Sequence, residues 1–317
     1  MRLHPQIEKA LQALAEANLP PLHTLSPGAA RDQMDAMVRA RGGVPAPIDR
    51  SEDRTIPGPA GEVPARIYWP KAADAGPEGS RGAVLYLHGG GFVIGGLDSH
   101  DTICRNLCAG AGAVVVSVDY RMGPEHKFPA AVDDCWAGLR WLAENAHTLG
   151  ADPACLAVAG DSAGGNLAAV VALLARDAGA PALKAQVLIY PVADCTFATE
   201  SYTQFAEGYG VLTRNAMEWF VDHYVSGPPD VGDWRASPIR AASFEGVAPA
   251  IVVVAECDVL RDDGNAIADA LRKASVPVEH LFYPGMIHGF FGMAPDVDDA
   301  ITAQAQVCHS LRQALGG

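Results

Sequence analysis

The chain has 317 residues, of which 49% are hydrophobic, and this size and composition suit one large α/β domain with an accessory part. It carries 23 Lys and Arg against 37 Asp and Glu, a formal net charge of −14, which disfavours nucleic acids and anionic membrane faces as partners. No apolar stretch approaches the ~20 residues of a membrane span, and the N-terminus lacks the pattern of an export signal, so neither membrane insertion nor export is expected.

Seven cysteines are scattered over helix-like and strand-like segments. Their odd number and their dispersal argue against a disulfide framework and favour a cytoplasmic location. Cys104 and Cys108 are spaced to share one helix face, but no clustered His or Cys accompanies them. We therefore expect buried thiols at these positions and no metal site.

The N-terminal part of the chain is helical in pattern and precedes the first strand. Apolar residues recur at helical spacing between residues 5 and 18, and a second helical stretch runs through residues 26–38. Residues 54–57 and 63–69 follow as strand-like segments that contain proline. Because proline is tolerated at the edge of a sheet, both segments are predicted to be edge strands.

The rest of the chain alternates between strand-like and helix-like segments. Apolar runs predict strands near residues 83–87, 113–118, 155–160, 185–190, 250–255 and 278–283. Helical patterns lie near residues 99–111, 131–146, 164–177, 263–274 and 297–315. Such alternation implies a mainly parallel sheet that is covered by helices on both faces.

One stretch interrupts this alternation, because no core strand is evident between Pro191 and Pro249. Within it, residues 213–224 are rich in aromatic side chains and helical in spacing. On this pattern alone the segment is predicted to be a peripheral helix packed on the sheet.

A glycine-rich loop follows the predicted strand 83–87, because residues 88–92 read His-Gly-Gly-Gly-Phe. Three consecutive glycines can form a flexible loop tip or a phosphate-binding turn. Against the second, neither a Gly-Lys-Ser/Thr ending nor a Gly-x-Gly-x-x-Gly pattern is present. A glycine-rich loop after a central strand can instead turn its N–H groups toward a carbonyl oxygen, so Gly90 and Gly91 are candidate donors of an oxyanion hole.

Residues 160–165 read Gly-Asp-Ser-Ala-Gly-Gly, between an apolar strand-like run and an Ala- and Leu-rich helical stretch. Gly-x-Ser-x-Gly can occur by chance in a chain with 33 glycines, so the context decides its meaning. Where a strand reverses into a helix within two residues, only small residues fit beside the turn, which explains Gly160 and Gly164. The turn presents Ser162 as a nucleophile, and it leaves the Ala163 N–H at a helix N-terminus to stabilise a developing negative charge.

A general base and an orienting acid are expected after the serine in chain order. His288 follows the last predicted strand and is the candidate base, because imidazole exchanges protons near neutral pH. Four carboxylates lie near the end of the preceding strand: Glu256, Asp258, Asp262 and Asp263. Position alone leaves the acid open, although the last two are also well placed to cap the following helix.

These motifs resemble those of the hormone-sensitive lipase-like branch of the α/β-hydrolases, the bacterial carboxylesterases of family IV. The resemblance covers about residues 60–315. Further matches are Asp-Tyr-Arg at 119–121, the run from Pro124 to Asp134, Leu-Ile-Tyr-Pro at 188–191 and Ile-His-Gly-Phe at 287–290. The chain departs from the family pattern at Met122-Gly123, where Leu-Ala is common, and at Val259, where proline usually follows the acid. The second departure predicts a less rigid acid loop.

The resemblance implies an α/β-hydrolase fold with an eight-stranded, mainly parallel sheet and a helical cap formed by residues 1–50 and 195–235. Residues 51–194 and 236–317 would then form the catalytic core. The resemblance also selects Asp258 as the acid that orients the base. Aromatic side chains are expected to wall an acyl pocket beneath the cap: Phe205, Tyr209, Trp219, Phe220 and Phe290.

The expected function is that of a serine carboxylesterase that hydrolyses short- to medium-chain acyl esters through an acyl-enzyme. No cofactor is expected, because Ser162 and His288 together supply the nucleophile and the acid–base group. Two alternatives remain open, an amidase or peptidase on the same fold and a non-catalytic ligand-binding receptor. The plant receptors that resemble this family lack the histidine, which is present here. The expected partners are a small-molecule ester and, through an edge strand, a second copy of the chain.

Overall fold

An eight-stranded sheet forms the centre of the computed structural model, which describes residues 2–41, 45–72 and 81–316. The strand order is β1-β2-β4-β3-β5-β6-β7-β8. β1 pairs antiparallel with β2 and β2 with β4, whereas all further neighbours are parallel, which confirms the predicted mainly parallel sheet. The strands are β1 (Arg50–Gly58), β2 (Gly61–Trp69), β3 (Ala83–Leu87), β4 (Val114–Val118), β5 (Leu156–Asp161), β6 (Leu183–Ile189), β7 (Ala250–Cys257) and β8 (Val278–Ile287).

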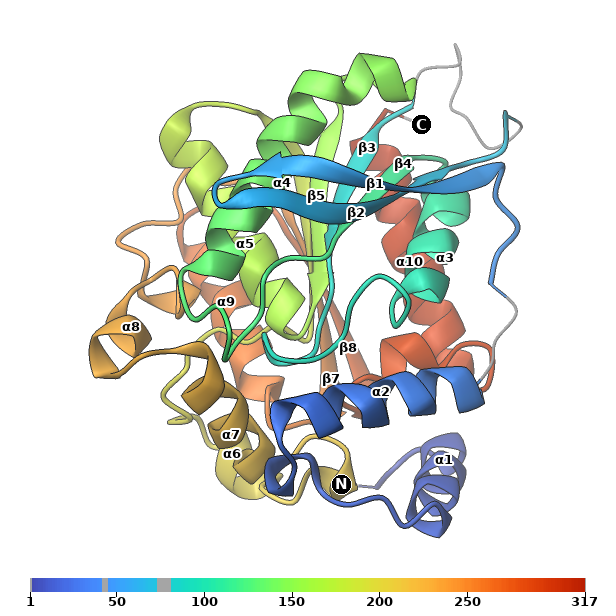
Figure 1. Cartoon of the computed structure of the whole chain (residues 1–317), viewed down its shortest axis with the longest axis vertical. Helices are drawn as coiled ribbons and strands as arrows, with labels where there is room; N and C mark the ends of the chain where they lie inside the picture. Colours follow the sequence, from blue (N-terminus) through green and yellow to red (C-terminus); the bar gives the residue numbers. More distant parts are fainter. Residues whose placement is uncertain (1, 42–44, 73–80, 317) are drawn as a thin grey trace.

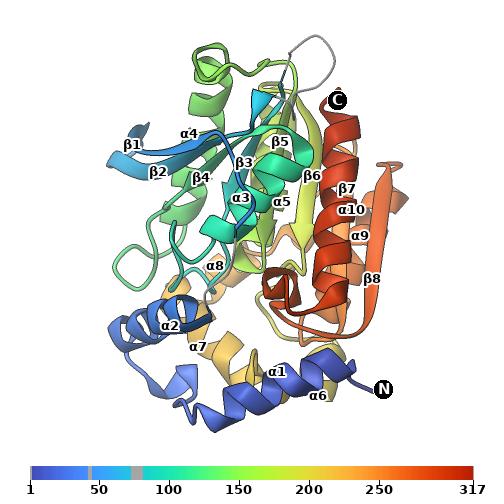
Figure 2. The same cartoon turned by 90° about the vertical axis from the view of Figure 1, so that its right-hand side faces the viewer.

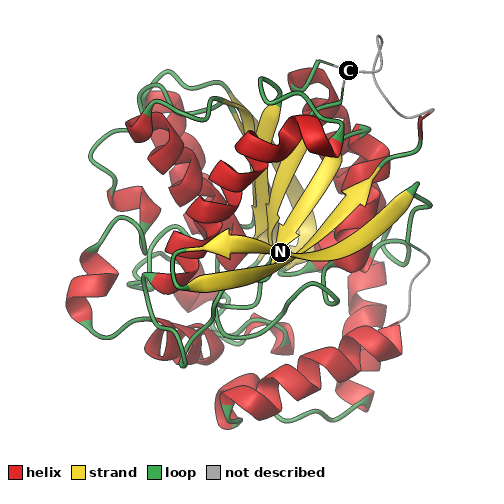
Figure 3. Ribbon diagram, turned by 45° about the horizontal axis from the view of Figure 1, so that its top comes forward, coloured by secondary structure: helices red, strands yellow, loops and turns green. Residues whose placement is uncertain are grey.

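Five long helices alternate with the parallel strands and cover both faces of the sheet (Figure 1, Figure 3). They are α3 (Asp101–Ala111), α4 (Ala130–Asn145), α5 (Ala163–Ala178), α9 (Arg261–Lys273) and α10 (Asp298–Ala314). α3 packs beside α10 on one face, and α4 packs beside α5 on the other. The crossover helices therefore bury the sheet on both sides, as its apolar strands require.

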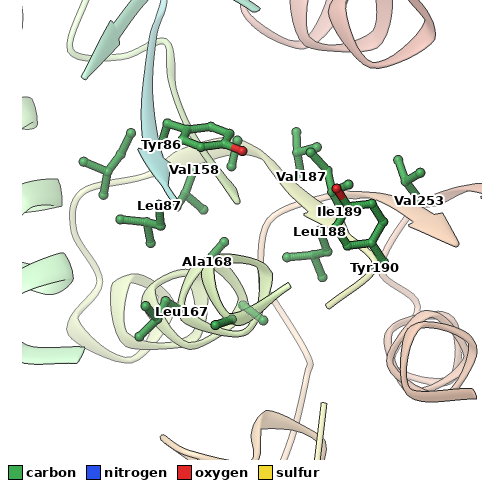
Figure 4. Close-up of a cluster of buried hydrophobic side chains, with 14 of the residues drawn as sticks. Tyr86, Leu87, Val158, Leu167, Ala168, Val187, Leu188, Ile189, Tyr190 and Val253 are labelled. Atoms are coloured by element: carbon green, nitrogen blue, oxygen red, sulfur yellow. The ribbon is translucent and has the colours of Figure 1, made fainter. Parts of the chain in front are cut away.

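The core is densest around α5, whose residues from Ala163 to Leu173 are all buried. In Figure 4, Leu167 and Ala168 of this helix face Leu87 and Val158 of the two central strands. The small Ala and Gly residues along α5 let the helix approach β3 and β5 closely, so the segment that follows Ser162 is tightly packed against the sheet. None of the described helices is both long enough and apolar enough to cross a lipid bilayer.

A helical layer gathers at one end of the molecule, where Figures 1 and 2 both show the N-terminal helices beside the helices that follow β6. Its elements are α1 (Pro5–Glu16), α2 (Pro27–Arg41), α6 (Ser201–Gln204), α7 (Arg214–Tyr224) and α8 (Pro228–Gly232). The predicted aromatic helix thus exists as α7. It packs on the N-terminal segment and on the loops beyond the sheet, rather than on the face of the sheet.

Two strand predictions need correction. β2 is an interior strand rather than an edge strand, because it pairs with β1 along its length and with β4 through residues 65–68. Pro64 is tolerated because it lies one residue before the β4 ladder, where only its carbonyl is used, by the Asp119 N–H at 2.9 Å. β8 also continues four residues beyond its predicted end at residue 283, through Pro284 and Gly285.

Candidate active site

Ser162 occupies the sharp turn between β5 and α5. Its backbone torsions are φ 56° and ψ −118°, a combination that residues other than glycine rarely adopt. A Cβ atom at Gly160 would overlap the carbonyl oxygen of Gly164, and one at Gly164 would overlap that of Leu87. The two glycines of the motif are therefore required by the close approach of three backbone segments.

Ser162, His288 and Asp258 form a continuous hydrogen-bonded chain. His288 Nε2 lies 3.1 Å from Ser162 Oγ, and His288 Nδ1 lies 2.8 Å from Asp258 Oδ2. Because a carboxylate only accepts, Nδ1 is assigned the proton, and Nε2 is free to accept from the serine hydroxyl. Asp258 is almost fully buried, with 1% of its surface exposed, and its other oxygen accepts the Leu260 N–H at 3.0 Å.

Strand pairing explains how the base and the acid come together. The last pair of the β7–β8 ladder joins Cys257 to Ile287, so Asp258 and His288 are the next residues of the two strands. The ring of Tyr190, which follows β6, lies 4.6 Å from the imidazole and supports it from the side of the core. The sequence analysis did not single out Tyr190 for this contact.

The other three candidate acids bind backbone groups instead of His288. Glu256 accepts the Gly285 N–H at 2.8 Å, and Asp262 accepts the Ser201 N–H at 2.8 Å. Asp263 accepts the N–H groups of residues 193 and 194 at 2.9 and 3.2 Å. Burial raises the pKa of Asp263 to about 7. Both aspartates lie in the first turn of α9, but this helix has no side-chain cap, so the capping role expected for them is wrong; they anchor instead the chain segment that leads into the helical layer.

The loop after β3 turns two peptide groups in a fixed direction. The Gly89 carbonyl lies 2.8 Å from His88 Nδ1, and the Gly90 carbonyl accepts the N–H groups of Val93 and Ile94 at 3.1 and 2.9 Å. In a trans peptide the C=O and N–H groups point in opposite directions. The N–H groups of Gly90 and Gly91 therefore point away from these partners, and neither they nor the Ala163 N–H donates to another described residue.

The helical layer packs directly on this loop. A Cβ atom at Gly91 would overlap the ring of Phe220, and Phe92 stacks on Tyr224 at 3.8 Å between ring centroids. Arg31 of α2 donates to the Val93 carbonyl at 2.8 Å. Arg31 also donates to the Gly123 carbonyl at 2.8 Å and forms a two-bonded ion pair with Glu125, whose pKa it lowers to about 2. A lone arginine in a predicted helix gave no signal of this role, which only the three-dimensional contacts identify.

The five predicted wall residues occupy different environments. Phe220 lies against Gly91 of the glycine loop, and Trp219 packs edge to face on Phe220 at 5.1 Å between ring centroids. Phe205 instead lies under the guanidinium of Arg261, and Tyr209 beside it is 42% exposed. Phe290 is fully buried and packs behind Tyr190, so it contacts the support of His288 from the interior. Of these five residues, Phe220 is the one that the described contacts bring to the glycine loop.

No group of three His, Cys, Asp or Glu within the described part of the chain is arranged to hold a metal ion. None of the seven cysteines forms a disulfide, and six of them, including Cys104 and Cys108, are buried. Cys257 adjoins Asp258 in the sequence, and burial raises the pKa of its thiol, which disfavours the thiolate that a cysteine nucleophile needs.

Comparison with known proteins places this geometry in a family. Residues 84–292 match the model of a family described by the alpha/beta hydrolase fold. The chain is 43% identical to a carboxylesterase (NlhH) of Mycobacterium tuberculosis, over 84% of this chain and 83% of that protein. The chain belongs to the hormone-sensitive lipase-like α/β-hydrolases.

Relatives that match over the whole length agree with this assignment. A Pseudomonas putida protein named ethyl acetate hydrolase is 39% identical, over 99% of this chain and all of that protein. The solved structure of a hyperthermophilic esterase from Pyrobaculum calidifontis is 42% identical over both full chains, with a TM-score of 0.92. An ester hydrolase from the metagenome of Lake Arreo, solved in complex with a phosphonate, is 39% identical over 99% of this chain and 100% of that one, with a TM-score of 0.93. The α/β-hydrolase described here is accordingly a carboxylic ester hydrolase.

The two departures from the usual pattern of these hydrolases have local explanations. A Cβ atom at Gly123 would overlap the His223 carbonyl of α7, so glycine is needed where the helical layer approaches. Val259 is fully buried, and its carbonyl accepts the Ser201 hydroxyl at 2.6 Å. Contacts of this kind tie the acid loop to the helical layer in place of a proline ring.

Proposed function

We propose that this hydrolase cleaves short- to medium-chain acyl esters, with Ser162 as nucleophile, His288 as general base and Asp258 as the orienting acid. The observation that carries the proposal is the hydrogen-bonded chain from Ser162 Oγ through the imidazole to Asp258, at 3.1 and 2.8 Å. Two relatives support a small ester as substrate, the ethyl acetate hydrolase and an arylesterase of Saccharolobus solfataricus that is 34% identical over 92% of this chain.

In the proposed mechanism, Ser162 Oγ forms a bond to the ester carbonyl carbon while its proton passes to His288 Nε2. The carbonyl oxygen gains the negative charge, and the N–H groups of Gly90, Gly91 and Ala163 donate to it. When the intermediate collapses, the alcohol leaves with the proton from His288, and Ser162 remains acylated. A water molecule then gives a proton to His288 and attacks the acyl carbon. The bond from this carbon to Ser162 Oγ breaks, the carboxylic acid leaves, and His288 returns the proton to Oγ.

The helical layer is proposed to act as a cap over the nucleophile, formed by residues 1–50 and 195–235. Residues 51–194 and 236–317 then form the catalytic core; residues 1, 42–44, 73–80 and 317 of these ranges lie outside the described structure. The contacts of Arg31 and Phe220 with the glycine loop support this division. Phe220 is the best supported pocket wall, because it lies against Gly91, one of the proposed oxyanion donors, and Trp219 packs on Phe220.

We also propose a homodimer and a reducing compartment such as the cytoplasm. β8 is the last strand of the described sheet, and Phe282 on it is 41% exposed. Ile301 of the neighbouring α10 is 46% exposed beside a 540 Å³ groove whose lining includes Glu279 of β8. An apolar edge of this kind suits pairing with a second copy. Seven cysteines without a disulfide suit a compartment that keeps thiols reduced.

The direct test is turnover of p-nitrophenyl acetate, butyrate, octanoate and palmitate by the wild type and by Ser162→Ala. The wild type should prefer the shorter acyl chains, and Ser162→Ala should lose roughly 10⁴-fold or more in kcat while keeping the wild-type unfolding temperature. A matched p-nitroanilide of the preferred acid separates esterase from amidase activity. Wild-type turnover by Ser162→Ala, or a preference for the anilide, would refute the proposal.

A further inference from the structure

A buried carboxylate lies beneath the glycine loop and has no part in the proton transfers above. Asp161 ends β5 directly before Ser162, and only 6% of its surface is exposed. Its Oδ1 accepts the Tyr86 hydroxyl at 2.6 Å and the Gly89 N–H at 3.0 Å, and it lies 3.3 Å from His100 Nε2. Burial alone would raise the pKa of Asp161, but His100 and the Tyr86 hydroxyl hold it below its usual value. The cost of burying a carboxylate is therefore offset by these contacts.

The Asp161 carboxylate fixes the first peptide of the loop. The carbonyl of the peptide between His88 and Gly89 accepts the Tyr120 hydroxyl at 2.6 Å, and its N–H donates to Asp161. Gly89 rests so closely on the carboxylate that an added Cβ would overlap Oδ2. Because the peptide is planar, contacts at both of its ends set the orientation from which the loop departs.

The next two peptides continue from this anchored plane. Their carbonyls belong to Gly89 and Gly90 and are held by His88 and by the N–H groups of Val93 and Ile94. Their N–H groups are the proposed oxyanion donors, Gly90 and Gly91. Asp161 holds the first of these three consecutive peptides. Without the Asp161 carboxylate, the two peptides that follow could rotate, and the N–H groups of Gly90 and Gly91 would rotate with them.

We propose that Asp161 is a positioning residue for the oxyanion hole, and that it acts by accepting the Gly89 N–H. This inference rests on the proposed function, because it assigns a role within the same site. Asp161 reaches the reacting atoms only through the loop. Its removal should therefore weaken binding of the transition state, in which the oxygen is charged, far more than binding of the neutral ester.

The test compares Asp161→Ala with Asp161→Asn. The alanine removes the Asp161 acceptor of the buried Gly89 N–H and leaves only its longer contact with His100 Nε2, at 3.3 Å, and a donor displaced by ~1 Å costs on the order of 100-fold in rate. Asp161→Ala should thus lose about 100-fold in kcat, with KM within about threefold of wild type. Asparagine retains an acceptor oxygen at Oδ1, so Asp161→Asn should restore kcat to within about tenfold of wild type.

A matched control is Asp134→Ala. Asp134 is also buried. It accepts the backbone N–H of Arg121 at 3.0 Å and two hydrogen bonds from the Arg121 guanidinium, but it does not contact the glycine loop. Its loss should lower the unfolding temperature and leave the kcat of the folded fraction within about threefold of wild type. Where Asp161→Ala does not fold, Asp161→Ser takes its place with the same expectation, because its hydroxyl is too short to reach Gly89.

The second readout is the rate at which a p-nitrophenyl phosphonate inactivates each variant. This reaction builds the same charged oxygen on Ser162 but needs no turnover, and it should slow in Asp161→Ala in parallel with kcat. The inference is overturned if folded Asp161→Ala keeps both rates within about threefold of wild type, or if Asp161→Asn is as slow as the alanine variant. A wild type that is phosphonylated but inactive on esters contradicts only the proposed substrate class, and the Asp161 comparison then stands on the phosphonate rates. A wild type that shows neither reaction overturns both proposals.

Discussion

Ser162 is held in a strained backbone conformation by its immediate neighbours. A conformation of this kind costs on the order of 1–3 kcal/mol and persists only where the surroundings enforce it. Here the Ser162 N–H donates to Ile189 at 2.8 Å, and its carbonyl accepts the Val192 N–H at 3.2 Å. The need for small flanking residues is local, which is why the sequence alone could predict this turn.

The choice among the acids is testable at the residue scale. Asp258→Asn should lower kcat on a short-chain ester by roughly 10⁴-fold, because an amide does not select the imidazole tautomer that accepts from Ser162. Asp262→Asn should stay within about tenfold of wild type, since Asp262 binds the Ser201 N–H rather than His288. Steady-state kinetics of both variants decide the matter. The reverse ranking would show that Asp258 is not the orienting acid.

The raised pKa of Asp263 predicts that the free energy of unfolding depends on pH. The unfolded chain releases its proton near 3.8 and the folded protein near 7, so unfolding between these values releases a proton. The free energy of unfolding should therefore fall as the pH rises from about 4 to 7. Asp263→Asn keeps an acceptor for residues 193 and 194 but does not titrate. Between about pH 4 and 7, the free energy of unfolding of Asp263→Asn should therefore rise by roughly 2–4 kcal/mol relative to that of the wild type.

Urea unfolding of both proteins at pH 5 and at pH 8 measures this difference. A stability gap between wild type and Asp263→Asn that is the same at both pH values would show that the carboxyl does not titrate in this range when folded. The measurement needs no catalytic activity, and it therefore tests the burial of Asp263 separately from the proposed chemistry.

At the scale of whole elements, strands and helices could be predicted where hydrophobic pattern reports burial, and the central β3, β5 and α5 are examples. The prediction failed where proline interrupts a strand. β2 was assigned to an edge and β8 was ended early, because a pattern does not show which backbone groups a neighbouring strand uses. The proposed nucleophile Ser162 and base His288 could be predicted from motif and chain order, whereas the proposed acid Asp258 was selected by the family resemblance. The contacts of Asp161, Tyr190 and Arg31 could not, since each depends on segments far apart in the sequence.

The hydrogen bonds of Arg31 predict that the N-terminal helix α2 helps to position the glycine loop. Arg31→Ala removes the donors to the Val93 and Gly123 carbonyls and the ion pair with Glu125. We expect a roughly tenfold loss of kcat/KM on a short-chain ester, because the loop loses its contact with the helical layer. Arg31→Lys keeps the charge but cannot make all of these bonds, so its kcat/KM should lie between that of the wild type and that of Arg31→Ala. Wild-type kinetics in Arg31→Ala would contradict a link between α2 and the loop.

At the scale of the whole molecule, the exposed edge of the sheet predicts the assembly. Phe282→Asp places a charge on the last strand, and it should shift the mass measured by light scattering from dimer to monomer. Ile301→Asp on α10 should act in the same direction. A monomeric wild type, or a dimer that survives both changes, would show that β8 does not form the interface.

Ser162 is expected to be the one reactive serine among twelve, because the fold brings His288 and Asp258 to it. The most direct measurement is peptide mass spectrometry of the protein after reaction with a p-nitrophenyl phosphonate. We expect a single phosphonyl adduct on Ser162, which is absent from His288→Ala treated in the same way. An adduct on another residue, or equal labelling of His288→Ala, would contradict it.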